Sequence, residues 1–282
     1  MIITVEDNYF LSITKIFLLN SNLFMLADSH CHLDGLDLEP YGGDIHKAIA
    51  CARAKNVKYI LCPGTSVENF PAVLKIAEND QDIFAAVGVH PTEENVYQPN
   101  LQELLTLAEH KKVVAIGETG LDFYYVTDDI KRKQQIELFK LHIQAAKELK
   151  KPLILHARDA DLDIIRVLKE EDAKKVGGVM HCFTASLDMA QAALDLGFYI
   201  SFSGIITFRN AQNLREIAKN IPIEKILIET DAPYLAPVPV RGKSNEPLYL
   251  PYIAEFMANL LGVSYEEFST QTTENFLRFC RL

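Results

Sequence analysis

Short apolar runs recur along the chain from Leu26 onward, and each is followed by a turn and then by a longer stretch of mixed polarity. Several of these runs contain almost no polar residue, which is typical of parallel strands that are buried on both faces. We predict eight strands, at residues 26–29, 57–62, 83–89, 113–117, 153–155, 178–180, 199–203 and 226–228.

In the stretches between the runs, apolar residues return every three or four positions, which is the spacing of an amphipathic helix. The clearest case covers residues 129–150, where Ile136, Phe139 and Ile143 share one face with Lys, Gln and Glu between them. Further helices are predicted at residues 47–55, 69–79, 101–110, 161–169, 187–196 and 210–219. The Pro-rich segment 232–251 is predicted as a long loop that leads into the final helices.

Eight strand–helix units in succession predict an α/β protein with a (β/α)8 TIM barrel, in which the chemistry lies on the loops after the strands. A doubly wound open sheet is the competing architecture. Only a closed barrel brings residues that follow the first strand close to residues that follow the last. The placement of the polar residues described below therefore favours the barrel.

The barrel is predicted to occupy residues 25–282 as a single domain, with residues 1–24 as an N-terminal extension of uncertain status. An apolar segment in the extension resembles a secretion signal, but Glu6 and Asp7 stand where such a signal carries basic residues. The segment is also too short and too broken to span a membrane. We therefore expect neither secretion nor a membrane anchor, and a natural start at Met25.

Composition and charge narrow the function classes. The 282 residues are 49% hydrophobic and 23% charged, with a formal net charge of −10. Such an acidic chain is a poor candidate for tight, non-specific duplex binding, but a locally positive cleft can still accept a nucleic acid. The five cysteines are scattered, odd in number and free of any C-x-x-C pair, which predicts a reducing, cytoplasmic location.

Residue types that bind divalent metals through nitrogen and oxygen stand at the ends of the predicted strands. Five of the eight histidines follow strands, and unrelated structural histidines would not select one rim of a barrel. These five are His30, His32, His90, His156 and His181. Glu118 follows the fourth strand and Asp231 the eighth, so the sequence predicts a metal site at the barrel mouth.

His30 and His32 are two residues apart and therefore point to the same side of an extended chain. We expect Glu118 directly after the fourth strand, held at the rim by a tight turn at Thr119 and Gly120. Asp231 is a candidate metal ligand, and the alternative interpretation is that it is an ordinary turn aspartate ahead of a proline. Four imidazoles and two carboxylates exceed the needs of one tetrahedral ion, and they suit two ions bridged by a carboxylate.

These residues lie in segments that resemble the TatD family of metal-dependent deoxyribonucleases, within the wider amidohydrolase-like barrels. The resemblance spans residues 26–282 with the order of the motifs preserved. The matching segments are DSHCHLD (28–34), VGVHP (87–91), IGETGLDFY (116–124), PLILHARDA (152–160), VMHCFTAS (179–186), SFSG (201–204), LIETDAPYLAP (227–237), RGKSNEP (241–247) and TTENFLRF (272–279).

The resemblance implies roles for the metal-binding residues. His30 and His32 would bind one metal with Asp231 alongside, and Glu118 would bridge the two ions. The second ion would be held by His156 and His181. The implied ions are Mg²⁺ or Mn²⁺, with Zn²⁺ as a further candidate. The implied catalytic residues are Asp231, as the general base, and Glu118.

The resemblance also implies that the protein is a 3′-to-5′ exonuclease that acts on DNA, preferentially single-stranded DNA. RNA is a further candidate substrate that the sequence leaves open. His90 and Arg158 would lie near the substrate, and Tyr234 and Arg241 are the other candidate contacts. One departure from the family is Ser244, near which the family often carries a basic residue.

Aromatic residues after the strands are candidates for stacking on the bases of a single strand. Packing beneath the rim loops is the favoured alternative for any single one of them, and Tyr234 is the best candidate for substrate contact. The candidates are Phe123, Tyr124, Phe183, Phe202 and Tyr234.

Two other functions remain open from the sequence. A hydrolase of the same barrel type acting on a small ester, lactone or amide is the first, although such enzymes commonly use a lysine-derived bridge and no lysine follows the fourth strand. A non-enzymatic scaffold is the second, and the complete set of six ligands argues against it. We expect a monomer, because no long apolar helix face stands out.

Overall fold

The computed structural model describes residues 24–93 and 97–282. Eight parallel strands form one sheet in which every strand neighbours the next in sequence. The strands are β1 (Leu26–Asp28), β2 (Val57–Pro63), β3 (Ile83–Val87), β4 (Val113–Asp122), β5 (Leu153–Arg158), β6 (Gly178–Met180), β7 (Phe198–Phe202) and β8 (Ile226–Ile228). The sheet closes where Ser29 N donates to Ile228 O and Asp231 N donates to His30 O. The predicted TIM barrel is confirmed.

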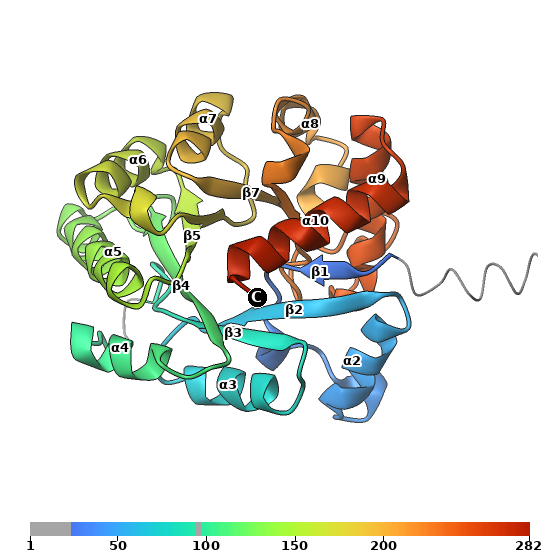
Figure 1. The fold of residues 1–282 in the computed structure, drawn as a ribbon, viewed down its shortest axis with the longest axis horizontal. Coiled ribbons are helices and arrows are strands. Elements are labelled where there is room, and N and C mark those ends of the chain that lie inside the picture. Colours follow the sequence, from blue (N-terminus) through green and yellow to red (C-terminus); the bar gives the residue numbers. More distant parts are fainter. Residues whose placement is uncertain (1–23, 94–96) are drawn as a thin grey trace, which may run out of the picture.

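Helices alternate with the strands and surround the barrel (Figure 1). The α-helices in the described part are α2 (Ile45–Arg53), α3 (Phe70–Glu78), α4 (Leu101–Ala108), α5 (Asp129–Leu149), α6 (Asp161–Glu170), α7 (Leu187–Asp195), α8 (Gln212–Ala218), α9 (Leu250–Leu261) and α10 (Tyr265–Cys280). Short 3₁₀ helices are Leu33–Gly35, Glu39–Tyr41, Ala173–Lys175, Gly204–Thr207, Ile223–Lys225 and Pro247–Tyr249. Side-chain caps fix several helix starts, for example a capping box between Asn100 and Glu103 at α4.

Two strands, β4 and β5, run several residues beyond the ends that the sequence pattern predicts. The predicted turn at Thr119 and Gly120 is wrong, because β4 continues through both residues to Asp122. The glycine serves close packing instead, since a Cβ on Gly120 would lie 2.0 Å from the carbonyl oxygen of His156 on β5. β5 likewise runs on to Arg158. The side chains at the carboxyl end of both strands therefore sit on rigid sheet rather than on loops.

The amino end of the barrel is closed by α10, which lies across it in Figure 1. Phe276 and Phe279 of this helix join the apolar residues that fill the barrel at this end, such as Leu61 and Ile154. The helix is fixed to the barrel by polar contacts as well: Asn275 Nδ2 donates to the carbonyl oxygen of Ile226 at 2.8 Å. With this end plugged, access to the interior is left to the carboxyl end.

The described helices include none that is both long enough and apolar enough to cross a bilayer. Of the predicted N-terminal extension, residues 1–23 lie outside the described residues. The apolar segment that resembles a secretion signal falls mostly within them.

Candidate metal centre

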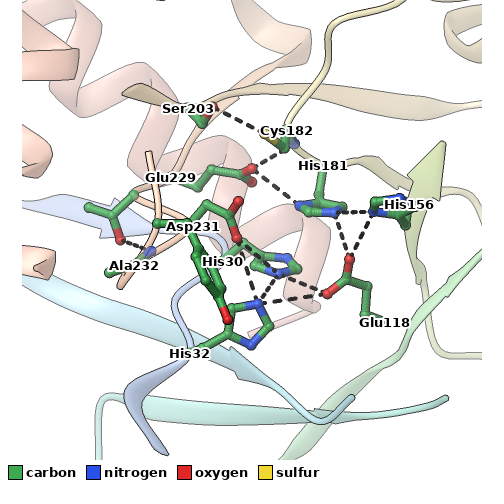
Figure 2. A network of polar contacts seen from close by, with 12 residues as sticks. His30, His32, Glu118, His156, His181, Cys182, Ser203, Glu229, Asp231 and Ala232 are labelled. Carbon is green, nitrogen blue, oxygen red and sulfur yellow. Dashed lines mark hydrogen bonds and ion pairs between the residues drawn. The ribbon is translucent and has the colours of Figure 1, made fainter. Parts of the chain in front are cut away.

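Glu118 contacts a cluster of imidazoles at the carboxyl end of the barrel, and Figure 2 shows it joined to His30 and His32 on one side and to His156 and His181 on another. Its side chain is almost completely buried. The Oε2 atom lies 3.1 Å from Nε2 of His30. The Oε1 atom lies 2.7 Å from Nε2 of His181, 3.3 Å from Nδ1 of His156 and 3.3 Å from Nε2 of His90. One carboxylate from β4 thus faces histidines that follow or belong to four other strands.

Asp231 supplies a second carboxylate on the β1–β8 side of the cluster. Its Oδ1 atom lies 3.6 Å from Nε2 of His32 and 3.8 Å from Nε2 of His30. The two histidine Nε2 atoms are themselves 3.2 Å apart, as their spacing in the sequence predicts for side chains on one face. The structure therefore brings the six residues predicted as metal ligands to one place, from both ends of the sequence.

The donor atoms fit divalent ions. Three groups each hold their ligand atoms within 4.8 Å of one another: His30 with His32 and Asp231, His90 with Glu118 and His156, and His30 with His181 and Glu229. Burial lowers the pKa of His32 to about 3, and burial likewise lowers the pKa of His30. Both imidazoles are therefore neutral at physiological pH, which is the form that ligates metals. Imidazole nitrogens suit Zn²⁺, and carboxylate oxygens suit Mg²⁺ and Mn²⁺, so this mixed donor set is compatible with a divalent ion.

Opposing charges dominate the side of the cluster formed by β4 and β6. Burial alone would raise the pKa of Glu118, but His181, His90 and His30 hold it well below its usual range. Burial alone would lower the pKa of His181, but the carboxylates of Glu118 and Glu229 raise it well above its usual value. The opposite pKa shifts of Glu118 and His181 show that each group favours the charged form of the other.

Asp231 behaves differently from the other carboxylates. Burial raises its pKa well above the usual range, and the nearby Glu229 and Glu118 add to the rise, against the opposing effect of His181. Asp231 is thus the carboxylate of the cluster with the strongest tendency to take up a proton.

Two further acids orient the imidazoles, and the sequence analysis missed both. Glu229 is fully buried, and its Oε1 atom lies 3.4 Å from Nδ1 of His181 while accepting a hydrogen bond from Cys182 N. Asp122 places Oδ2 3.1 Å from Nε2 of His156. These contacts leave the other ring nitrogen of each histidine facing Glu118. Two-residue alternation within β4 would have found Asp122, which is four residues after Glu118. It would not have found Glu229, because Glu229 and Asp231 both follow the end of β8 at Ile228.

Asp28 was also missed, and its role is to fasten the barrel seam beneath the cluster. It is fully buried, and its carboxylate accepts hydrogen bonds from Thr230 Oγ1 at 2.6 Å and from Thr230 N at 2.9 Å. Burial raises the pKa of Asp28 to about 7 despite these bonds. Asp28 precedes His30 and Thr230 precedes Asp231, so the same contact sets the position of both ligand-bearing segments.

A cleft of about 820 Å³ opens above the cluster. His90, Arg158 and Tyr234, three of the predicted substrate contacts, line it. Arg241 is not among the lining residues; its guanidinium carbon lies 3.9 Å from the ring centroid of Phe208 and its Nη1 donates to the carbonyl oxygen of Ala236.

The predicted stacking residues divide by exposure. Phe183 and Phe202 are buried beneath the rim, as the packing alternative predicts. Tyr124 and Tyr234 are exposed. Phe123 is half-buried and packs against the guanidinium of Arg132.

A (β/α)8 barrel that gathers imidazoles and carboxylates at the carboxyl ends of its strands is the architecture of a metal-dependent hydrolase. Comparison with known proteins defines the family. The model of the TatD related DNase family matches residues 27–281, and the chain belongs to this family. The protein is therefore an enzyme, a metal-dependent hydrolase.

Individual relatives agree with this assignment. The chain is 48% identical to an uncharacterized metal-dependent hydrolase, YcfH, of Escherichia coli strain K12, over 90% of this chain and 94% of the relative. It is 35% identical to a protein of Klebsiella pneumoniae named 3′-5′ ssDNA/RNA exonuclease TatD, over 83% of this chain and 91% of the relative. The crystal structure of the Escherichia coli TatD homologue YJJV superposes with a TM-score of 0.83 at 32% identity, covering 91% of this chain and 98% of that one.

Proposed function

We propose that the protein is a nuclease that hydrolyses phosphodiester bonds of single-stranded DNA from the 3′ end, with RNA as a second substrate. Membership of the TatD related DNase family supports a nucleic-acid substrate. The direction of cleavage and the preference for single strands are taken from the name of the Klebsiella pneumoniae relative.

The position of Glu118 is the observation that carries the proposal. Its Oε2 faces His30 while its Oε1 faces His156 and His181, so a single carboxylate lies between two sets of imidazoles. Two ions would be held there, one by His30, His32 and Asp231 and the other by His156 and His181, with Glu118 bridging. Paired divalent ions are a recurrent solution for phosphodiester hydrolysis.

When bound, such ions lower the pKa of a coordinated water and neutralise charge on the phosphate. Asp231 would accept a proton from the attacking water, because its carboxylate faces the cleft and lies beside the His30–His32 pair. Arg158, on the rim, would bind a non-bridging phosphate oxygen. His90 is held by a 2.7 Å contact between Nδ1 and Thr92 Oγ1, which leaves Nε2 directed at Glu118 and the cleft.

Charge and lining residues distinguish this proposal from the small-molecule alternative. The chain carries a net charge of −10, so capture of a polyanion must depend on the local field of the bound ions and Arg158. Among the described residues that line the cleft there is no lysine, so the lysine-derived bridge common in the small-molecule hydrolases has no source here.

The test is hydrolysis of oligonucleotides labelled at the 3′ or the 5′ end, single- or double-stranded, DNA or RNA, with Mn²⁺, Mg²⁺, Zn²⁺ or EDTA. We expect single-stranded DNA to be shortened from the 3′ end, most rapidly with Mn²⁺, and no cleavage in EDTA. Full activity in EDTA, or hydrolysis of lactones or amides with no phosphodiester cleaved, would overturn the proposal. A monomeric state and a cytoplasmic location stay predictions of the sequence.

A further inference from the structure

Two tyrosines on the loop after β4 are exposed although the loop itself is well anchored. Tyr124 is 54% and Tyr125 65% exposed, and their rings meet edge to face with centroids 5.0 Å apart. Large aromatic side chains usually bury most of their surface in a core or an interface. Two adjacent tyrosines held in solvent at the edge of the cleft therefore need an explanation other than packing.

Arg158 joins the two rings into one surface. Its guanidinium carbon lies 4.0 Å from the ring centroid of Tyr124 and 4.8 Å from that of Tyr125. It comes from the end of β5, two residues after His156, and both Arg158 and Tyr125 line the cleft above the metal centre. The surface thus combines aromatic faces with a positive charge and borders the reaction site.

The loop that carries the tyrosines is fixed from beneath by α5. Arg132 Nε donates to the carbonyl oxygen of Val126 at 2.8 Å, and Arg132 Nη2 donates to that of Phe123 at 3.0 Å. The same guanidinium packs over the ring of Phe123. Ordering a surface loop costs conformational entropy, so these contacts favour a role that requires the tyrosines in a defined position.

One carboxylate connects this surface to the metal centre. Asp122 Oδ1 accepts a hydrogen bond from Tyr125 N at 2.8 Å, and Asp122 Oδ2 lies 3.1 Å from Nε2 of His156. The opposite ring nitrogen of His156 faces Glu118. The tyrosines are therefore positioned relative to the metal ligands through a short, rigid chain of contacts rather than through the length of a loop.

We propose that Tyr124 and Tyr125 form a stacking platform for the unpaired bases next to the scissile phosphate, with Arg158 packed on the rings and left to bind the phosphate, and that this platform makes the enzyme prefer single strands. The proposal rests on the nuclease function proposed above and adds the residues that select the form of the substrate. Unpaired bases offer free π-faces to aromatic and guanidinium groups, whereas bases within a duplex are already stacked on their neighbours. A positive charge among the rings also favours a polyanionic strand over an apolar protein segment.

The test compares an alanine pair with a phenylalanine pair. We expect Tyr124→Ala/Tyr125→Ala to raise KM for a ten-nucleotide oligo-dT by about tenfold or more, since stacking contributes strongly at each base. Tyr124→Phe/Tyr125→Phe keeps the rings and should stay within about twofold of the wild type, the size of a small surface effect. Tyr252→Ala, which removes an exposed tyrosine of α9 outside the cleft, is the matched control.

A small substrate without a base, methyl p-nitrophenyl phosphate, separates binding from chemistry. The alanine pair should lose far more kcat/KM on oligo-dT than on this ester, and its preference for single over double strands should fall. An unchanged KM for oligo-dT, or equal losses on both substrates, would overturn the platform. If the wild type hydrolyses neither substrate, the nuclease proposal fails instead, and fluorescence anisotropy of labelled oligo-dT on wild type and variants still decides whether the platform binds bases.

Discussion

The two ends of the barrel are formed by the same eight strands and have opposite chemistry. At the carboxyl end, Glu118 and Asp231 lie buried among imidazoles beneath an open cleft. At the amino end, Phe276 and Phe279 of α10 pack on apolar strand residues and close the barrel. The burial of apolar surface stabilises the fold, whereas the burial of charged groups opposes it unless they are paired or bind an ion.

This contrast assigns stability to one end and chemistry to the other. Loss of side-chain volume in the plug at the amino end is expected to lower stability without changing the reaction. Loss of a carboxylate from the cluster at the carboxyl end is expected to lower activity. Substitutions at the two ends should therefore change different measurements, and each prediction below tests whether the separation holds.

Glu118→Gln should have the largest effect, a loss of hydrolysis of about ten-thousandfold, or roughly 5 kcal/mol in the barrier. The amide keeps the shape of the side chain but supplies no anion for the bridging role that we propose for Glu118. The circular dichroism spectrum and cooperative unfolding should be retained. Glu137→Gln, at an exposed glutamate of α5, is the control and should leave turnover unchanged. Near wild-type turnover in Glu118→Gln would remove the bridging role.

Phe276→Ala tests the opposite end and should lower the free energy of unfolding by about 3 to 5 kcal/mol, the cost of a cavity in a packed core. Phe276 is fully buried and packs near the rings of Tyr59 and Phe84. Urea denaturation gives the loss, and kcat measured at low temperature, where the variant stays folded, should match the wild type. If Phe276→Ala is as stable as the wild type, or is folded but inactive, the conclusion that the amino end serves stability and not the reaction is wrong.

His142 sharpens the comparison, because it is a buried histidine that takes no part in the cluster. Its Nε2 accepts a hydrogen bond from Val89 N, and its Nδ1 bonds to the carbonyl oxygen of Leu138. Burial lowers the pKa of His142 from its usual value of 6.5 to about 4. Above pH 6.5 the ring is neutral in both states. As the pH falls toward 4, only the unfolded chain takes up the proton, so about 3 kcal/mol of stability is lost.

Denaturation measured from pH 7 to pH 4 on the wild type and on His142→Gln checks this prediction. As the pH falls, the free energy of unfolding of the wild type should decrease more steeply than that of the variant. The difference in slope should correspond to the uptake of about one extra proton on unfolding. His110→Gln changes a half-exposed histidine outside the cluster and is the control. Parallel curves for the wild type and His142→Gln would show that His142 does not account for the acid sensitivity.

Stabilisation by Mn²⁺ is the smallest predicted effect. It can be compared in one experiment between the wild type and variants at the two ends of the barrel. At a concentration one hundred times its Kd, the ion should add about 2.7 kcal/mol to the stability of the wild type. Phe276→Ala should gain the same increment, because distant sites are additive. Glu118→Gln should gain clearly less. Equal increments in all three proteins would place the ion somewhere other than around Glu118.

The sequence predicts the barrel and the convergence of the ligands because both depend on local periodicity. Apolar runs mark the strands, and His30, His156 and Asp231 fall at the ends of three of them. The length of β4 could not be predicted in this way, because Gly120 reads equally well as a turn residue and as a point of close strand approach.

Other features depend on three-dimensional context. Arg241 begins the matching segment RGKSNEP, yet its guanidinium packs on Phe208, which is far from it in sequence. The exposure of Tyr124 and Tyr125 depends on how the neighbouring rim segments fold around them. Glu229 and Asp122 contact histidines rather than lining the rim. A stricter use of strand alternation would have singled out Asp122, which lies in β4, but not Glu229, which follows β8.

The double contact of Asp122 has a consequence for how this enzyme can diverge. Because its two oxygens serve the loop of Tyr125 and the ring of His156 at once, any replacement of Asp122 disturbs both together. Under the stacking role proposed for Tyr124 and Tyr125, substitutions at these two residues should change substrate choice without loss of rate, whereas substitutions at Asp122 should not. Laboratory evolution for new substrates should accumulate its substitutions in the loop while this aspartate stays invariant.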